Sequence, residues 1–172
     1  MEWRQIVIES YDRAAQVLER TLKSLTVEDL DYLPDPGSNS IGWLAWHLTR
    51  CQDRSVAELT GEEQIWIKNG WYERFGGTRD PKDWGLGDTP EQVAAFKSPA
   101  VDTIMGYHHD VLKRTKAYVG ALSEADISRT LEHPRYKNVG MRLAGIIGDN
   151  LQHAGQAAYV RGLLKGRGWM DA

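Results

Sequence analysis

The sequence has a single cysteine, Cys51, among its 172 residues, so no disulfide can form within the chain. No apolar run approaches the roughly 20 residues that a membrane-spanning helix needs. The first residues, Met-Glu-Trp-Arg-Gln, lack the basic and apolar regions of a secretory signal. We therefore expect a cytoplasmic protein with no membrane partner.

The chain also lacks an excess of charge of either sign. Its 21 Lys and Arg residues face 24 Asp and Glu residues, which gives a formal net charge of −3. A weakly acidic balance gives no reason to expect nucleic acid as a partner. The sequence has no phosphate-binding P-loop, and no glycine-rich turn follows a strand pattern, so nucleotide binding is unsupported.

What the chain does contain is the composition of a soluble globular protein, with 41% apolar and 26% charged residues. A chain of this length can bury a substantial core without disulfides. It is too short for two domains of ordinary size. We therefore expect one domain over residues 1–172.

Four segments carry the apolar periodicity of long helices, at about residues 3–25, 41–59, 99–122 and 139–165. Ser40 is a typical N-cap for the second, and Ser98-Pro99 is a typical start for the third. No segment shows the period-two alternation of a half-buried strand over a useful length. The sequence therefore predicts an all-α fold, a four-helix bundle.

Residues 61–97 form a long irregular connection that is rich in glycine and contains three tryptophans: Trp66, Trp71 and Trp84. Short helical turns are expected near residues 62–66 and 89–96. A connection of this length indicates a crossover between helices two and three, or a functional segment. The tryptophan rings are expected to pack it onto the bundle, and the same rings can also line a substrate pocket.

Asp149 and His153 are four residues apart in the last helix, which places both side chains on one face, one turn apart. Carboxylate and imidazole are both ligands for zinc and its first-row neighbours. His47 borders the inward stripe of the second helix. Together these residues would supply three ligands and leave open positions for water or substrate, as in catalytic sites. The simpler alternatives are a plain Asp–His ion pair and a core histidine with a satisfied hydrogen bond.

Three further residues are candidates for the surroundings of this site. His108 lies on the apolar stripe of the third helix and either contacts substrate or ligand, or is a buried, hydrogen-bonded histidine. Cys51, four residues after His47, is a candidate ligand or nucleophile, or a small core residue. Gln156, about one turn beyond His153, can orient a ligand through a hydrogen bond.

The segments Ile41-Gly-Trp-Leu-Ala-Trp-His47 and Asp149-Asn-Leu-Gln-His153-Ala-Gly-Gln156 resemble the two motifs of the DinB/YfiT-like superfamily. The resemblance implies an up-down-down-up bundle, a divalent metal on His47, Asp149 and His153, and a homodimer. Trp43, within the first motif, is a further candidate for contact with a ligand or for the substrate pocket. Asp149 stands where the commonest pattern has histidine, and this departure resembles the branch that includes the N-terminal domain of mycothiol-dependent maleylpyruvate isomerase.

The resemblance implies a metal-dependent enzyme, with zinc or nickel as the expected ion and a small-molecule substrate. The leading hypothesis is an S-transferase or isomerase that uses a low-molecular-weight thiol, because a metal lowers the pKa of a thiol and so favours the nucleophilic thiolate. Metal-assisted hydrolysis is a second hypothesis. A third is a non-catalytic, stress-linked bundle that binds a metal or small ligand.

Overall fold

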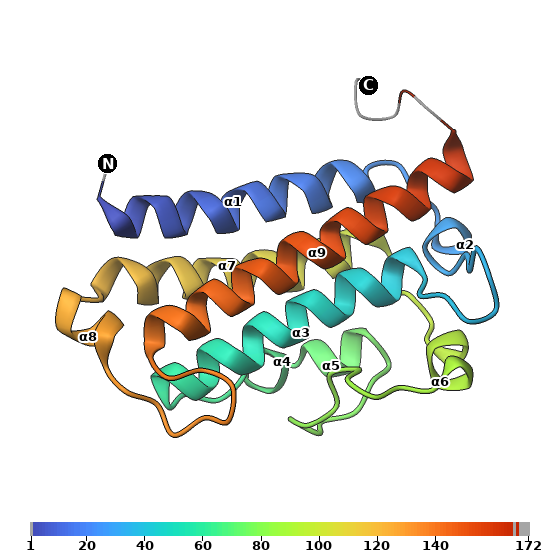
Figure 1. Ribbon diagram of the computed structural model, residues 1–172. Helices are drawn as coiled ribbons and strands as arrows, with labels where there is room; N and C mark the ends of the chain where they lie inside the picture. The colour runs from blue at the N-terminus through green and yellow to red at the C-terminus, as the bar shows by residue number, and fades with distance from the viewer. Residues whose placement is uncertain (1, 167, 169–172) are drawn as a thin grey trace.

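The computed structural model of the chain describes residues 2–166 and 168, and four long helices dominate it (Figure 1). They are α1 (Trp3–Leu22), α3 (Ile41–Thr60), α7 (Val101–Ala121) and α9 (Val139–Lys165). In Figure 1, α3 and α7 run in the direction opposite to α1 and α9. The described residues form no strand, only an isolated bridge between Thr130 and Asn138, so the prediction of an all-α fold is confirmed.

The long helices pack in a square in which α9 contacts α3 and α1, and α7 contacts the same two helices from the other side. The most enclosed of them is α3, because every residue from Ile41 to Asp53 is buried. One face of α3 lies on the other long helices, and the crossover covers its outer face. Polar side chains on both faces of α3 are therefore removed from water. None of the described helices is long and apolar enough to cross a membrane.

The helix ends follow the local chemistry of the chain. The hydroxyl of Ser40 accepts a hydrogen bond from the backbone of Trp43 and begins α3, as the sequence predicted. However, α1 ends at Leu22 rather than near residue 25, because Ser24 adopts the left-handed backbone conformation with φ 62°. Helix α7 begins at Val101 rather than at residue 99, with Ala100 as its N-cap in an extended conformation, and Asp31 accepts the backbone N–H of Ser98 at 2.9 Å.

Five short helices complete the described chain: α2 (Val27–Leu30), α4 (Ile65–Lys68), α5 (Trp71–Arg74), α6 (Pro90–Ala95) and α8 (Glu124–Ser128). The expected turns near residues 62–66 and 89–96 correspond to α4 and α6, whereas α2 and α5 were not predicted from the sequence. Trp66 and Trp71 are buried, and Trp84 is half-buried. The tryptophans of the crossover therefore pack it against the bundle.

A buried network holds the crossover on α3. Arg50 donates to the carbonyl of Asp83 and to the side chain of Gln64, both at 2.8 Å. The carboxylate of Asp53 accepts the backbone N–H groups of Ile65 at 2.9 Å and Trp66 at 2.8 Å. Because these bonds reach both ends of the irregular stretch, they fix it over the outer face of α3 and position residues 83–88 beside His47.

Candidate metal centre

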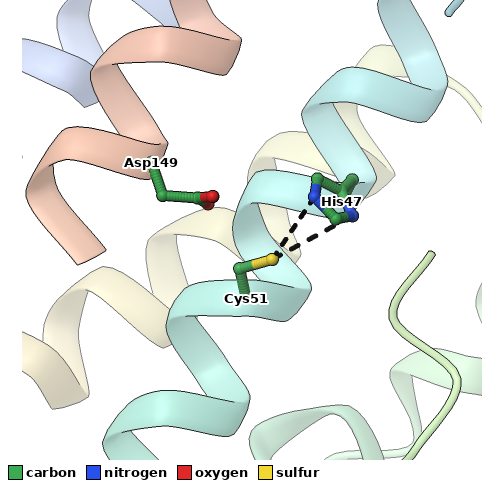
Figure 2. A group of neighbouring side chains, drawn as sticks. All are labelled: His47, Cys51 and Asp149. Carbon is green, nitrogen blue, oxygen red and sulfur yellow. Dashed lines mark hydrogen bonds between the residues drawn. The ribbon is translucent and has the colours of Figure 1, made fainter. Parts of the chain in front are cut away.

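Side chains that bind metals converge where α3 faces α9. His47 and Cys51 lie one turn apart on α3, and Asp149 projects toward them from α9 (Figure 2). One ligand atom of each residue lies within 4.8 Å of the others. The sulfur of Cys51 is 3.5 Å from Nε2 of His47. This arrangement of nitrogen, sulfur and oxygen can hold one metal ion.

His153 lies at the edge of the same cluster. Its Nε2 is 3.4 Å from Oδ1 of Asp149, one turn earlier on α9. Its ring also meets that of His47 edge-on, with ring centroids 4.8 Å apart. The structure therefore brings His47, Asp149 and His153 together and adds Cys51, which the sequence offered as a ligand, a nucleophile or a core residue.

The imidazole of His47 is held from three sides. Its ring lies nearly parallel to Trp43, with centroids 4.6 Å apart, and to Trp84 at 6.1 Å. Its Nδ1 is 2.6 Å from the backbone oxygen of Trp84, so this nitrogen carries the proton and donates it to the carbonyl. The lone pair is therefore on Nε2, the atom that faces Cys51, and a ligand of this kind is typical of oriented metal sites.

The approach of the crossover to His47 depends on Gly85. A Cβ atom on this residue would lie 2.9 Å from Nδ1 of His47 and 2.8 Å from the ring of Trp43, and its φ is +84°. Asp88 adds a hydrogen bond of 3.1 Å from the indole nitrogen of Trp43. Sequence reasoning missed the roles of Gly85 and Asp88, because their part of the chain has no periodicity from which to place a side chain.

His153 is oriented in the same way as His47. Its Nδ1 lies 2.7 Å from the side-chain oxygen of Gln156, so this nitrogen donates and Nε2 is left as the acceptor. The two histidines therefore present equivalent nitrogens, one fixed by a backbone carbonyl and the other by an amide. This contact is the one that the sequence hypothesis gave to Gln156.

One atom of the cluster has no partner among the described residues. Oδ2 of Asp149 is buried and accepts no hydrogen bond, whereas Oδ1 faces His153. A buried acceptor without a partner costs free energy, and a cation would satisfy it. The carboxylate of Asp149, 3.4 Å from Nε2, favours a second proton on the ring of His153 and so raises its pKa, whereas burial lowers the pKa of His47.

Comparison with known proteins bears on this cluster. Residues 10–157 match the sequence profile of the DinB superfamily. The chain belongs to the DinB superfamily. The crystal structure of a conserved protein from Enterococcus faecalis superposes with a TM-score of 0.88 at 29% identity, covering 97% of this chain and 99% of that one. No curated protein matches the sequence.

DinB proteins are associated with metals, and the residues of this chain fit one. Imidazole, thiolate and carboxylate together suit zinc and its first-row neighbours. In the metal-free state, burial and the nearby Asp149 raise the pKa of Cys51, so its thiol holds its proton. The unpaired oxygen of Asp149 and the two oriented imidazoles are the features that a metal would complete.

His108, the remaining candidate, lies deeper in this DinB bundle. Its Nδ1 is 3.1 Å from the hydroxyl of Thr49, and its side chain is 1% exposed. The threonine hydroxyl donates to the carbonyl of Ala45, so His108 donates to Thr49. No described hydrogen bond joins His108 to the cluster, and its Nε2 has no described partner.

Two cavities of the DinB bundle adjoin the cluster. One, of about 470 Å³, is lined by Cys51, Asp149 and Trp84 among other residues. The second, of about 540 Å³, is lined by Gln156 together with Leu44 and other residues of α9 and the loop before α3. The first cavity is therefore lined directly by residues of the cluster, Cys51 and Asp149. The second cavity adjoins the cluster through Gln156, whose amide orients His153.

Proposed function

We propose that this DinB protein is a divalent-metal-dependent enzyme that uses a low-molecular-weight thiol as co-substrate in a transfer or isomerisation reaction. The ligands are His47, Asp149 and His153, and zinc or nickel is the ion. The observation that carries the proposal is the convergence of oriented ligand atoms around an unpaired carboxylate oxygen, beside a cavity large enough for a small molecule.

In the proposed reaction, the metal ligands, the groups that orient them and the surrounding aromatic rings would have different roles. A bound divalent ion would lower the pKa of a thiol and so favour its nucleophilic form. The carbonyl of Trp84 and the amide of Gln156 hold the two imidazoles in position. The rings of Trp43 and Trp84 lie nearly parallel to the ring of His47, which is 6% exposed, and limit the access of water. In a transfer, the thiol would lose its proton, its sulfur would form a bond to carbon as the bond from that carbon to the leaving group breaks, and the leaving group would take the proton. In an isomerisation, the carbon–sulfur bond would form and break again, and the thiol would be released with its proton.

The carboxylate at position 149 supports the thiol reaction over hydrolysis, through its resemblance to the branch that includes mycothiol-dependent maleylpyruvate isomerase. No side chain of the cluster stands out as the additional general base that hydrolysis would need. The homodimer and the cytoplasmic location remain predictions from the sequence.

Cobalt substitution tests the proposal. The Cys51→Ser variant is used so that any sulfur-to-cobalt charge-transfer band must come from an added thiol. We expect one cobalt per chain, visible d–d absorption, and a new near-ultraviolet band when mercaptoacetate is added. Failure of both the wild type and Cys51→Ser to bind cobalt or zinc would overturn the proposal, and metal binding without a thiol band would favour the hydrolase or the non-catalytic module.

A matched histidine serves as the control for this experiment. His109 is half-exposed on α7 and contacts Glu19 instead of the cluster. We expect His153→Ala to lose the metal and His109→Ala to retain it. Equal metal content in the two variants would remove His153 from the site.

A further inference from the structure

The cavity of about 470 Å³ beside the candidate metal centre has an unusual distribution of charge. Cys51 and Asp149 form part of its wall. Three arginines, Arg54, Arg135 and Arg142, form other parts. Asp149 is the single acidic residue among the described residues that line it. A cavity with this balance attracts an anion, and a divalent ion at the centre would strengthen the attraction.

Two of these arginines are held in place by their surroundings. The guanidinium carbon of Arg54 lies 4.5 Å from the centre of the Trp84 ring, and that of Arg142 lies 4.9 Å from the centre of the Tyr136 ring. Both also donate to Glu58, each at 2.8 Å. The side chains are 31% and 10% exposed, so little conformational freedom remains to be lost when a ligand binds.

Glu58 does not exhaust the hydrogen-bonding capacity of the pair. One carboxylate between two guanidinium groups leaves a net positive charge. Each guanidinium has five N–H donors, and the described ion pairs engage one nitrogen of Arg54 and one of Arg142. The planar fork of arginine matches a carboxylate, which it binds through two parallel hydrogen bonds.

The second cavity near the centre offers no such chemistry. Its described lining contains amides, hydroxyls and apolar side chains, and no charged residue. We therefore expect an anionic substrate to bind in the arginine-lined cavity and an uncharged substrate to bind in the second cavity.

We propose that the arginine-lined cavity binds the carboxylate of a small organic acid between Arg54 and Arg142, with the reactive end of the acid directed toward Cys51 and Asp149. This proposal rests on the proposed function, and it identifies the low-molecular-weight thiol as one that carries a carboxylate. Arg54 and Arg142 are then the residues that determine specificity for that co-substrate.

The first test needs no metal. Succinate is titrated into the metal-free protein by calorimetry, with succinamide as the uncharged match. We expect succinate to bind and succinamide not to bind. We expect Arg54→Gln to lower the affinity for succinate by at least about tenfold, which is the effect of one lost charge-assisted hydrogen bond. Arg13→Gln on the exposed face of α1 removes the same charge and should change nothing.

Arg142 is nearly buried, so a large change there can disturb folding. Arg142→Lys keeps the charge and removes the fork, and we expect it to weaken succinate less than Arg54→Gln does. The proposal would be overturned if Arg54→Gln left the affinity for succinate unchanged, or if succinate and succinamide bound with equal affinity.

The second test separates this proposal from the proposed function. In the cobalt-loaded Cys51→Ser protein, mercaptoacetate should bind at least about tenfold more tightly than mercaptoacetamide, and Arg54→Gln should remove the preference. If both thiols give the sulfur band with equal affinity, the carboxylate site is wrong and the thiol function stands. If neither thiol gives the band while succinate binding still depends on Arg54, the thiol function is wrong and the anion site stands.

Discussion

Two buried polar clusters lie on α3, and they differ in whether their atoms are paired. Arg50 and Asp53 face the crossover with side chains that are fully buried, and both oxygens of Asp53 accept hydrogen bonds. His47 and Cys51 face α9, where Oδ2 of Asp149 has no partner among the described residues. The carboxylate of the first cluster is fully paired without a ligand, whereas the carboxylate of the second is not.

The difference separates a structural role from a binding role. Buried polar groups are tolerated when every donor and acceptor is satisfied, and then they fix a unique arrangement of the chain. A cluster with an unpaired buried acceptor beside a cavity has a free-energy cost that a cation can offset. Burial of polar residues is therefore not enough to indicate a site. The state of their hydrogen bonds is the more informative property.

The largest effect is expected from Asp53→Ala. This change removes the carboxylate that pairs with Arg114 and lies 3.7 Å from the buried Arg50. It also removes the acceptor for two backbone N–H groups of the crossover. We expect the free energy of unfolding to fall by roughly 3–5 kcal/mol. Urea unfolding followed by circular dichroism measures this loss.

The control for that experiment is an ion pair at the surface. Asp12 pairs with Lys116 at 2.7 Å, and both side chains are part-exposed. We expect Asp12→Ala to cost no more than about 1 kcal/mol. Equal losses for Asp53→Ala and Asp12→Ala would show that the buried network does not hold the crossover in place.

His108 provides the next test, because it has an unpaired buried nitrogen but belongs to neither cluster. Burial lowers the pKa of His108 to about 4, from an ordinary value of 6.5. Between these values the unfolded chain binds more protons than the folded one. The free energy of unfolding should therefore fall by up to about 3 kcal/mol as the pH drops from about 6.5 to 4. Above about pH 6.5 the protein should keep the whole of this contribution to its stability.

Unfolding experiments in urea at about pH 7 and about pH 4.5 measure this dependence. The His108→Gln variant should lose less stability on acidification than the wild type, because glutamine does not titrate. His109→Gln, a change at the exposed neighbour, should lose only a small part of the dependence, because the charge of His109 is the lesser cause of the lowered pKa of His108. Identical slopes for wild type and His108→Gln would mean that another group is responsible for the acid sensitivity.

The sequence predicted the parts of this molecule that repeat with helical period. The long helices, the Ser40 cap and the approach of Asp149 to His153 all follow from spacing along one helix. The meeting of His47 with Asp149 required two helices to pack, and the motif resemblance supplied that pairing. Spacing along the sequence could not show that His47 lies beside the pair Asp149 and His153.

The crossover was beyond such reasoning. The carbonyl of Trp84 that orients His47 belongs to an irregular backbone, and a carbonyl leaves no mark on the sequence. Gly85 matters because a Cβ would meet His47 and Trp43, which is a tertiary constraint. Arg54 and Arg142 are half a chain apart and meet only through Glu58. These features depend on contacts between distant segments, for which a single sequence carries no signal.

A third prediction concerns the unpaired oxygen itself. Asp149→Asn preserves the shape of the side chain and removes its charge. We expect zinc affinity, measured by calorimetry, to fall by about 100-fold or more. This exceeds the loss of roughly 10- to 100-fold that is usual for a residue that only hydrogen-bonds to a metal ligand. The metal-free protein should change in stability by no more than about 1 kcal/mol, since the pair with His153 is partly exposed. Unchanged zinc affinity would exclude Asp149 as a ligand.

The smallest effect is expected at Gln156, which touches the cluster only through His153. Gln156→Ala removes the acceptor 2.7 Å from Nδ1 and frees the ring to rotate or change tautomer, so zinc affinity should fall by roughly 10- to 100-fold. Gln152→Ala, one turn earlier on the exposed face of α9, is the matched control and should retain wild-type affinity. Because Gln156 is exposed, the free energy of unfolding without metal should stay within about 0.5 kcal/mol of the wild type. A loss of stability as large as the loss of affinity would mean that Gln156 supports the helix packing, and that the orientation of His153 is not its role.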